Sequence, residues 1–185
     1  TTMGAQDLPQ TLDFLSQQEQ KALSNLKYAR VIQAAVGFRQ WKGPELTGFG
    51  GLVPFVENRD ILGALFMSAF LPNRAPKEGA LLSVFMGGTR REDIFSRSDR
   101  EIETIIAREL KDMFRLNSFD PDMLRIMRYE HAIPQYGKES RERFEAIRNI
   151  HQKHNGLIIA GNVRDGIGMA DRIKQAADLA GQLQD

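Results

Sequence analysis

The 185-residue sequence contains no cysteine, almost no net charge and no apolar run long enough to cross a bilayer. Without cysteine there is no disulfide scaffold, no thiolate zinc site and no cysteine nucleophile. The 25 lysines and arginines nearly balance the 24 aspartates and glutamates, which argues against a dedicated nucleic-acid binder. The longest apolar stretch, residues 61–71, is too short for a transmembrane helix.

Targeting and metal-binding signals are also scarce. The opening TTMGAQDLPQ lacks the basic and apolar regions of a signal peptide, so the sequence predicts a cytoplasmic protein, with peripheral membrane contact left open. His151 and His154 lie three residues apart, but no third ligand is evident and no metal site is expected. Local sequence suggests no Ser/His/Asp arrangement, and we assign no catalytic residue.

What the sequence does contain predicts an α+β fold. With 42% hydrophobic residues, a chain of this length can bury a sizeable core. Apolar, β-branched-rich stretches predict five strands in a mostly antiparallel sheet, at 28–40, 49–56, 61–69, 80–87 and 123–131. The polar residues 57–60 predict a hairpin between the second and third strands. Flanking helices are predicted at 17–25, 99–115, 139–152 and 170–183.

Two of these helices begin with a capping box, in which a serine and a glutamate three residues later satisfy each other's backbone N–H groups. The pairs are Ser16 with Glu19, and Ser98 with Glu101. In the second helix the apolar residues recur at helical spacing, which predicts that one face packs on the sheet. They are Ile102, Ile105, Ile106, Leu110 and Met113.

The most informative stretch is GLIIAGNVRDGIGMADRI, at residues 156–173. A short apolar strand at 157–160 leads into a glycine-rich loop and then a helix. Glycines let a backbone approach a ligand closely, and a helix N-terminus favours an anionic or electron-accepting group. The same pattern also suits a plain connection in which the glycines serve turn geometry alone.

This stretch resembles the closing flavin-binding segment of the protoporphyrinogen and coproporphyrinogen oxidases, which belong to the flavin amine oxidase superfamily. Three further blocks resemble that family in order and spacing. They are LTGFGGLVPFVENRDILGALFMSAFLPNRAP at 46–76, LLSVFMGGTR at 81–90 and AIPQYGKE at 132–139.

The resemblance implies that one part of the family's protein is missing from this sequence. That family holds the ADP part of FAD on an N-terminal G-x-G-x-x-G motif, and no such motif occurs here. We therefore expect a fragment or one member of a split enzyme. Residues 1–135 would form part of the substrate-binding domain, and residues 136–185 would form the C-terminal segment that completes the FAD-binding domain.

The resemblance also implies two sets of site residues. The first would contact FAD: Gly161, Asn162, Gly166, Ile167, Gly168 and Met169. The second would pack against a tetrapyrrole: Phe49, Leu52, Leu65 and Phe85. The alternative for the second set is that these side chains are ordinary sheet core, because one face of an antiparallel sheet is often core.

The implied activity is FAD-dependent porphyrinogen oxidation in heme biosynthesis. Protoporphyrinogen IX or coproporphyrinogen III would lose hydride to the flavin, with O2 as final acceptor, and this chain alone would be inactive. One alternative is another superfamily enzyme, such as an amine oxidase or a carotenoid desaturase. A second is a non-catalytic binding module. The sequence does not distinguish the two porphyrinogens or set the oligomeric state.

Overall fold

The computed structural model describes residues 1–182, and the chain divides into two compact units. The sheet unit is Ala29–Ala132. The terminal unit comprises Thr1–Tyr28 together with the chain from Ile133 onward. The functional division expected from the sequence, with a substrate-binding part at 1–135 and an FAD-contacting part at 136–185, stays a prediction. The compact units themselves group the first 28 residues with the C-terminal part. These residues belong to the terminal unit because Leu8 and Leu23 share a core with Ile147 and Ile150.

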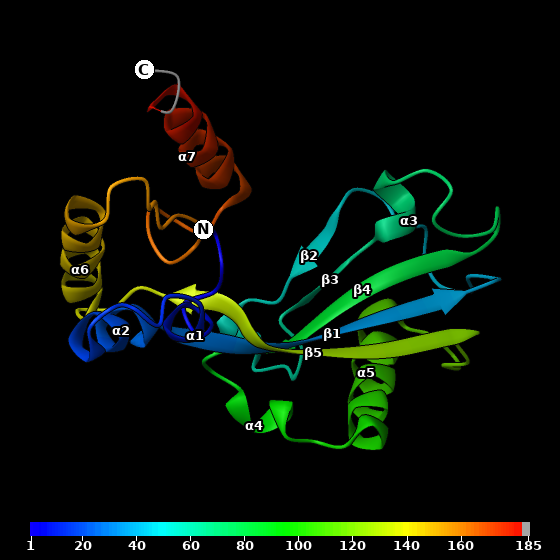
Figure 1. Ribbon diagram of the computed structural model, residues 1–185. Helices are drawn as coiled ribbons and strands as arrows, with labels where there is room; N and C mark the ends of the chain where they lie inside the picture. The colour runs from blue at the N-terminus through cyan, green and yellow to red at the C-terminus, as the bar shows by residue number, and fades with distance from the viewer. Residues whose placement is uncertain (183–185) are drawn as a thin grey trace. The chain divides into compact units, whose positions relative to one another are not determined.

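A five-stranded antiparallel sheet with the strand order β2-β3-β4-β1-β5 forms the sheet unit's framework (Figure 1). This confirms the predicted α+β class. The register pairs Val36 of β1 with Leu82 of β4, and Ala64 of β3 with Val84 of β4. The strands are β1 Lys27–Phe38, β2 Gly50–Leu52, β3 Gly63–Leu65, β4 Ala80–Gly87 and β5 Met123–Gln135.

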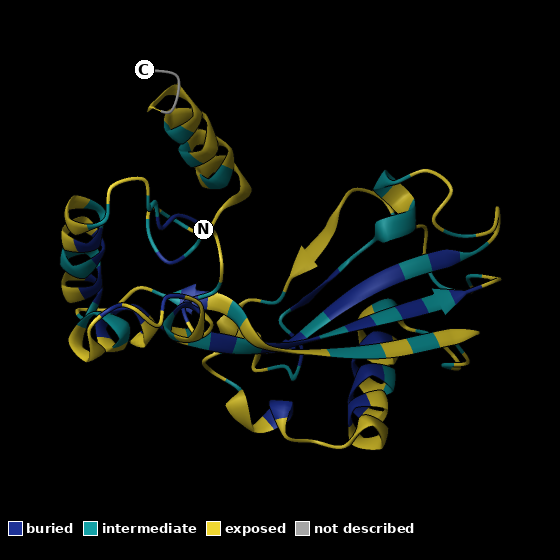
Figure 2. Ribbon diagram, viewed as in Figure 1, coloured by how far each residue is buried: buried dark blue, intermediate teal, exposed yellow. Residues whose placement is uncertain are grey.

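Helix α5, Asp99–Phe114, covers one face of this sheet (Figure 2). It begins with the predicted capping box, because the Ser98 side chain accepts from the Glu101 N–H and the Glu101 carboxylate accepts from the Ser98 N–H. Four of the five predicted apolar side chains are buried. Met113 is 36% exposed instead, because it lies in the last turn, next to the helix end.

The second and third strands are shorter than predicted. Pro54 ends the β2 ladder because it has no N–H to donate, and a 3-10 helix, η1 at Phe55–Glu57, follows it. After β3 the chain turns into the short helix α3, Met67–Phe70, where the Ser68 hydroxyl accepts from the Leu81 N–H. β2 and β3 do pair as the predicted hairpin, but their connection spans residues 53–62. A further short helix, α4 at Glu92–Phe95, was not predicted.

The terminal unit contains the helices α1 Leu8–Thr11, α2 Gln17–Ser24, α6 Ser140–Lys153 and α7 Met169–Gln182. The first three contribute side chains to a second core, whereas α7 contributes none. The predicted capping box at Ser16 is present, and Lys153 of α6 donates to its Glu19 at 2.6 Å. Within residues 1–182 no helix is long and apolar enough to span a membrane. The last residue of the helix predicted at 170–183 lies outside the described residues.

The predicted strand at residues 157–160 is absent. Among residues 1–182 only Thr1 makes long-range backbone–backbone hydrogen bonds to this segment: its N-terminal amine donates to Ile158 O at 2.6 Å, and Ala160 N donates to Thr1 O at 2.9 Å. A single neighbouring residue is too short to make a ladder, so the segment is extended without belonging to a sheet.

Candidate functional site

The glycine-rich loop between residues 160 and 169 is held by side chains that bind its backbone carbonyls. The Tyr136 hydroxyl lies 2.8 Å from Asn162 O and 3.1 Å from Gly166 O, so its single proton is shared across the loop. Arg143 Nε donates to Val163 O at 3.0 Å. Burial raises the pKa of Tyr136, so the hydroxyl remains a donor at neutral pH.

A side chain of helix α7 binds two further carbonyls of the loop, those of Arg164 and Asp165. Arg172 Nη2 donates to Arg164 O at 3.0 Å and to Asp165 O at 2.7 Å. Gln175, one turn later, accepts from Gly161 N and from Arg172 Nη1, both at 2.8 Å. Its amide nitrogen donates to the Asp165 carboxylate at 2.9 Å. All five carbonyls from residue 162 to residue 166 are therefore bound by side chains.

Arg143 is a fully buried cation without a carboxylate partner among the described residues. Besides Val163 O, it donates to Asn25 O at 3.2 Å and to Ser140 Oγ at 3.1 Å. Its guanidinium carbon also lies 5.5 Å from the centre of the Tyr136 ring. Burial lowers the pKa of Arg143, yet a guanidinium stays charged at neutral pH. It therefore places a positive charge behind the loop.

Backbone angles and contacts within the chain itself explain why glycine occupies some positions of the loop. Gly161 and Gly166 have φ values of +92° and +96°, which side chains rarely adopt. A Cβ on Gly161 would lie 3.1 Å from the Thr2 carbonyl oxygen, and one on Gly166 would lie 2.4 Å from the Asp171 carboxylate. Gly168 has no such φ, and its N–H donates to Asp171 at 3.0 Å. Turn geometry thus explains two of these glycines without a ligand.

The predicted flavin-contacting residues lie together on this one loop and at the first residue of α7. Ile167 and Met169 are large apolar side chains with 49% and 80% exposure, so neither belongs to a core. Because Asp171 already binds the N–H of Gly168, the first turn of α7 is capped from within the chain.

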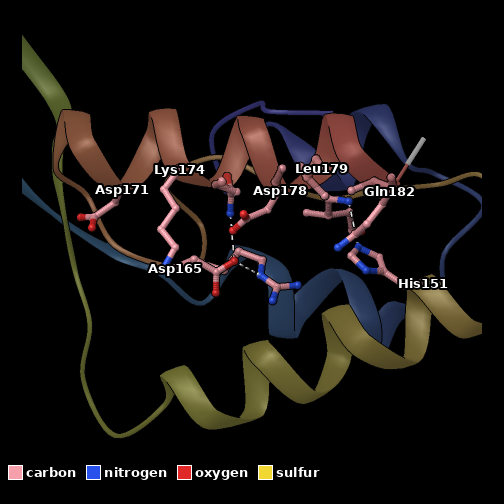
Figure 3. Close-up of a pocket in the computed structure, with 12 residues that line it drawn as sticks. His151, Asp165, Asp171, Lys174, Asp178, Leu179 and Gln182 are labelled. Atoms are coloured by element: carbon pink, nitrogen blue, oxygen red, sulfur yellow. Dashed lines mark hydrogen bonds and ion pairs between the residues drawn. The ribbon is translucent and has the colours of Figure 1, made fainter. Parts of the chain in front are cut away.

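A cavity of about 480 Å³ lies beside α7 within the terminal unit, where Arg164 and Asp165 of the loop also line it (Figure 3). Lys174, Asp178 and Gln182 reach it from α7, while His151 comes from α6. The His151 Nε2 accepts from Ile159 N at 2.9 Å, and burial lowers its pKa, so the ring is neutral. None of the predicted site residues lines this cavity.

In the sheet unit the strand register places three predicted tetrapyrrole residues on one face. Ala64 and Val84 point into the core between the sheet and α5. Leu65 and Phe85, their neighbours along the strands, therefore point to the opposite face of the sheet. Leu52 shares that face because it pairs with Gly63, which in turn pairs with Phe85. We call this surface the open face.

The open face is not sheet core. Leu52 is 85% exposed, and both Leu65 and Phe85 are half-buried. Phe49 precedes β2, is 72% exposed and packs against Phe70 with ring centres 5.0 Å apart. None of these four side chains belongs to the buried core, and their contact with a tetrapyrrole stays a prediction.

An ion-pair network fixes the hairpin connection that follows Leu52. Arg59 donates to the buried Glu109 of α5 at 3.1 Å and pairs with Asp112 at 2.6 Å. Asp60 is bound by Arg91 and Arg108. Burial opposes the ionisation of Asp60, but hydrogen bonds from the two arginines outweigh it and lower its pKa. The connection is thereby attached to the helix under the sheet.

Sequence reasoning missed Tyr136, Arg143 and Arg172, although signals for two of them exist. Tyr136 belongs to the AIPQYGKE block, directly after β5. Arg143 stands on the buried stripe of α6 with Ser140, Ile147 and Ile150, where a charged residue is unusual. Nothing in the local sequence distinguishes Arg172 from a solvated helix residue.

Comparisons with known proteins identify relatives of both units together. Protoporphyrinogen oxidase of rice (chloroplastic, Oryza sativa subsp. japonica) is 31% identical over 144 residues, covering 76% of this chain and 27% of the relative. Coproporphyrinogen III oxidase of Bacillus subtilis is 26% identical over 155 residues, covering 83% of this chain and 33% of the relative. The chain thus spans about a third or less of these relatives.

Structural similarity agrees with the sequence matches. The crystal structure of a putative protoporphyrinogen oxidase from Exiguobacterium superposes with a TM-score of 0.77 at 18% identity, covering 98% of this chain and 40% of that protein. At this identity the likeness establishes the fold. The family model described as flavin containing amine oxidoreductase matches residues 5–171. The resemblance seen in the sequence is confirmed, and the chain belongs to the flavin-containing amine oxidoreductase family.

Proposed function

We propose that this chain forms the substrate-binding and flavin-contacting part of an FAD-dependent porphyrinogen oxidase of heme biosynthesis. The observation that carries the proposal is the open face, a partly exposed apolar surface on the five-stranded sheet. Family membership supports the flavin, and the names of the relatives support a porphyrinogen substrate.

The open face suits a large flat apolar ring. Leu52, Leu65 and Phe85 supply aliphatic and aromatic contact area. Gly63 lies between them, and because it has no side chain the surface is recessed there. Ser83 on the same face is hydrogen-bonded by Gln33 at 2.7 Å, so its hydroxyl is satisfied without a ligand. Ligand sites of this kind are mostly apolar with a few polar groups.

The loop from Gly161 to Met169 is the part of the chain that fits the flavin. Its carbonyls are turned toward Tyr136, Arg143 and Arg172, and the two guanidinium groups give it a positive environment. Such an environment favours the pyrophosphate of FAD or the charge that reduction places on the ring. When bound, FAD would accept hydride from the porphyrinogen, and O2 would take the electrons. The chain's own residues would orient the ligands and exclude water from the apolar surface.

A tetrapyrrole titration of the 185-residue chain tests the open face. Leu52→Ser and Val56→Ser both change an apolar side chain that is at least 85% exposed, so neither should affect folding. Only Leu52 lies on the open face. We expect Leu52→Ser to weaken binding of coproporphyrin or protoporphyrin about tenfold, the loss of one apolar contact, and Val56→Ser to leave it unchanged. Quenching of porphyrin fluorescence measures the affinity.

This titration, together with a measurement of flavin uptake, separates the alternatives. No porphyrin binding by the chain would favour another oxidase of the superfamily, with a different substrate. Porphyrin binding without flavin uptake, after the dinucleotide-binding part of a relative is supplied, would favour a non-catalytic binding module. Because the G-x-G-x-x-G motif is absent from the sequence, the chain alone is expected to bind FAD weakly and to be inactive.

A further inference from the structure

Because side chains bind the five consecutive carbonyls of residues 162–166, the directions of the neighbouring backbone N–H groups are determined as well. In a trans peptide the C=O of one residue and the N–H of the next point in opposite directions. Fixing the carbonyls of residues 162–166 therefore fixes the N–H groups of residues 163–167. Each of these N–H groups points away from the side chain that binds its carbonyl partner. The Tyr136 hydroxyl matters most for this arrangement, because it alone joins the two ends of the run, Asn162 and Gly166.

We propose that Tyr136 is a positioning residue for the flavin, which it holds indirectly by closing the loop between Asn162 and Gly166. The identity of the ligand rests on the proposed function, whereas the loop contacts do not. The hydroxyl reaches both carbonyl oxygens within 3.1 Å, and Arg143 and Arg172 bind the three carbonyls between them. A carbonyl that accepts a hydrogen bond also makes the N–H of its own peptide a stronger donor. The hydroxyl thus sets both the shape of the loop and its strength as an anion-binding surface.

The variant Tyr136→Phe removes only the hydroxyl. The Phe ring would keep the edge-to-face contact with Phe144, whose ring centre lies 6.0 Å away, and the contact with the Arg143 guanidinium. The matched control is Tyr129→Phe on β5, because in the described part of the chain the Tyr129 hydroxyl reaches only the Met127 sulfur, at 3.9 Å. The two substitutions are chemically identical and differ only in what the hydroxyl binds.

The first measurement needs no flavin. Hydrogen–deuterium exchange of the 185-residue chain reports how firmly residues 161–168 are held, through the amides of Gly161, Arg164 and Gly168, which donate hydrogen bonds within the chain. We expect Tyr136→Phe to speed exchange in this segment about tenfold, which corresponds to the loss of roughly one hydrogen bond. Tyr129→Phe should leave it unchanged. Unchanged exchange in Tyr136→Phe would overturn the proposal.

The second measurement distinguishes positioning of the flavin from a merely structural role. With the dinucleotide-binding part of a relative supplied, Tyr136→Phe should weaken FAD binding about tenfold and shift the flavin's reduction potential to more negative values. Faster exchange with an unchanged FAD affinity and potential would overturn the inference alone. A wild-type complex that takes up no flavin would overturn the proposed function together with it.

Discussion

Helices α5 and α7 are similar in length and both amphipathic, yet the described chain covers them very differently. In α5 five of 16 residues are buried, and its apolar face packs on the sheet. In α7 none of 14 residues is buried. It is attached through polar side chains, because Arg172 and Gln175 bind the loop, while the apolar Met169 and Ile173 are 80% and 66% exposed.

The contrast shows that amphipathic spacing predicts a helix more safely than it predicts the partner of its apolar face. α5 is stabilised by apolar burial, and α7 is fixed by directional hydrogen bonds to backbone groups. Helix α7 and the loop before it should therefore respond to changes in polar groups and backbone geometry. The sheet unit should respond to loss of apolar volume.

The largest expected effect compares one isoleucine from each helix. Ile106→Ala removes a fully buried side chain from α5 and should lower the free energy of unfolding of the sheet unit by about 3 kcal/mol. Ile173→Ala removes an exposed one from α7 and should change stability by less than about 0.5 kcal/mol. Urea unfolding of the 185-residue chain measures both. Equal losses would mean that α7 is covered in solution.

A smaller effect compares the loop with the helix that follows it. Gly161→Ala places a side chain at φ +92° and 3.1 Å from the Thr2 carbonyl oxygen, which should cost about 1–2 kcal/mol. Gly181→Ala on α7 meets open space and should stabilise the helix by about 0.5–1 kcal/mol. Thermal unfolding followed by circular dichroism should show shifts of opposite sign. A stable Gly161→Ala variant would contradict the assigned loop geometry.

The smallest effect concerns pH and the two capping boxes. The hydrogen bond from Lys153, together with those from Ser16, lowers the pKa of Glu19 from 4.5 to about 2. Because the folded-state pKa is the lower one, this stabilisation is present above pH 4.5 and is lost as pH falls toward 2. At pH 7 Glu19→Gln should cost the terminal unit about 1 kcal/mol, and the cost should shrink across that window.

The matched control is Glu101→Gln in the capping box of α5. The pKa of Glu101 is also lowered, chiefly by the hydrogen bond from the Ser98 side chain, but its cationic partner is Arg97 at 3.6 Å, farther away than the 2.6 Å between Lys153 and Glu19. Unfolding midpoints of both variants at pH 7 and pH 3 measure the difference. A larger pH dependence at Glu101 than at Glu19 would show that the lysine contributes little.

Much of the local structure and the family could be predicted from the sequence. Both capping boxes form as their serine and glutamate spacing indicates, and β4 has the predicted bounds. These features depend on residues close together in the chain, where spacing determines which groups meet. The four family-like blocks identified the superfamily because their order and spacing extend over nearly the whole chain.

Other features were decided only by tertiary structure. The apolar run at residues 157–160 predicted a strand, but a strand needs a neighbour, and within residues 1–182 Thr1 alone pairs with this backbone from a distant part of the chain. The glycines at 161 and 166 suggested a ligand, but their backbone angles and the nearness of Thr2 and Asp171 also require them.

The side chains that bind the carbonyls of the glycine-rich loop are the clearest case. Tyr136, Arg143 and Arg172 come from three separate segments, and only folding brings them to five consecutive carbonyls. The sequence by itself determined the four longer helices, most strands and the family, because these follow from local spacing and from the order of blocks along one chain. Which polar side chains hold the loop was decided by the tertiary structure, since a hydrogen bond depends on distance and direction in space, which residue spacing along the chain does not specify.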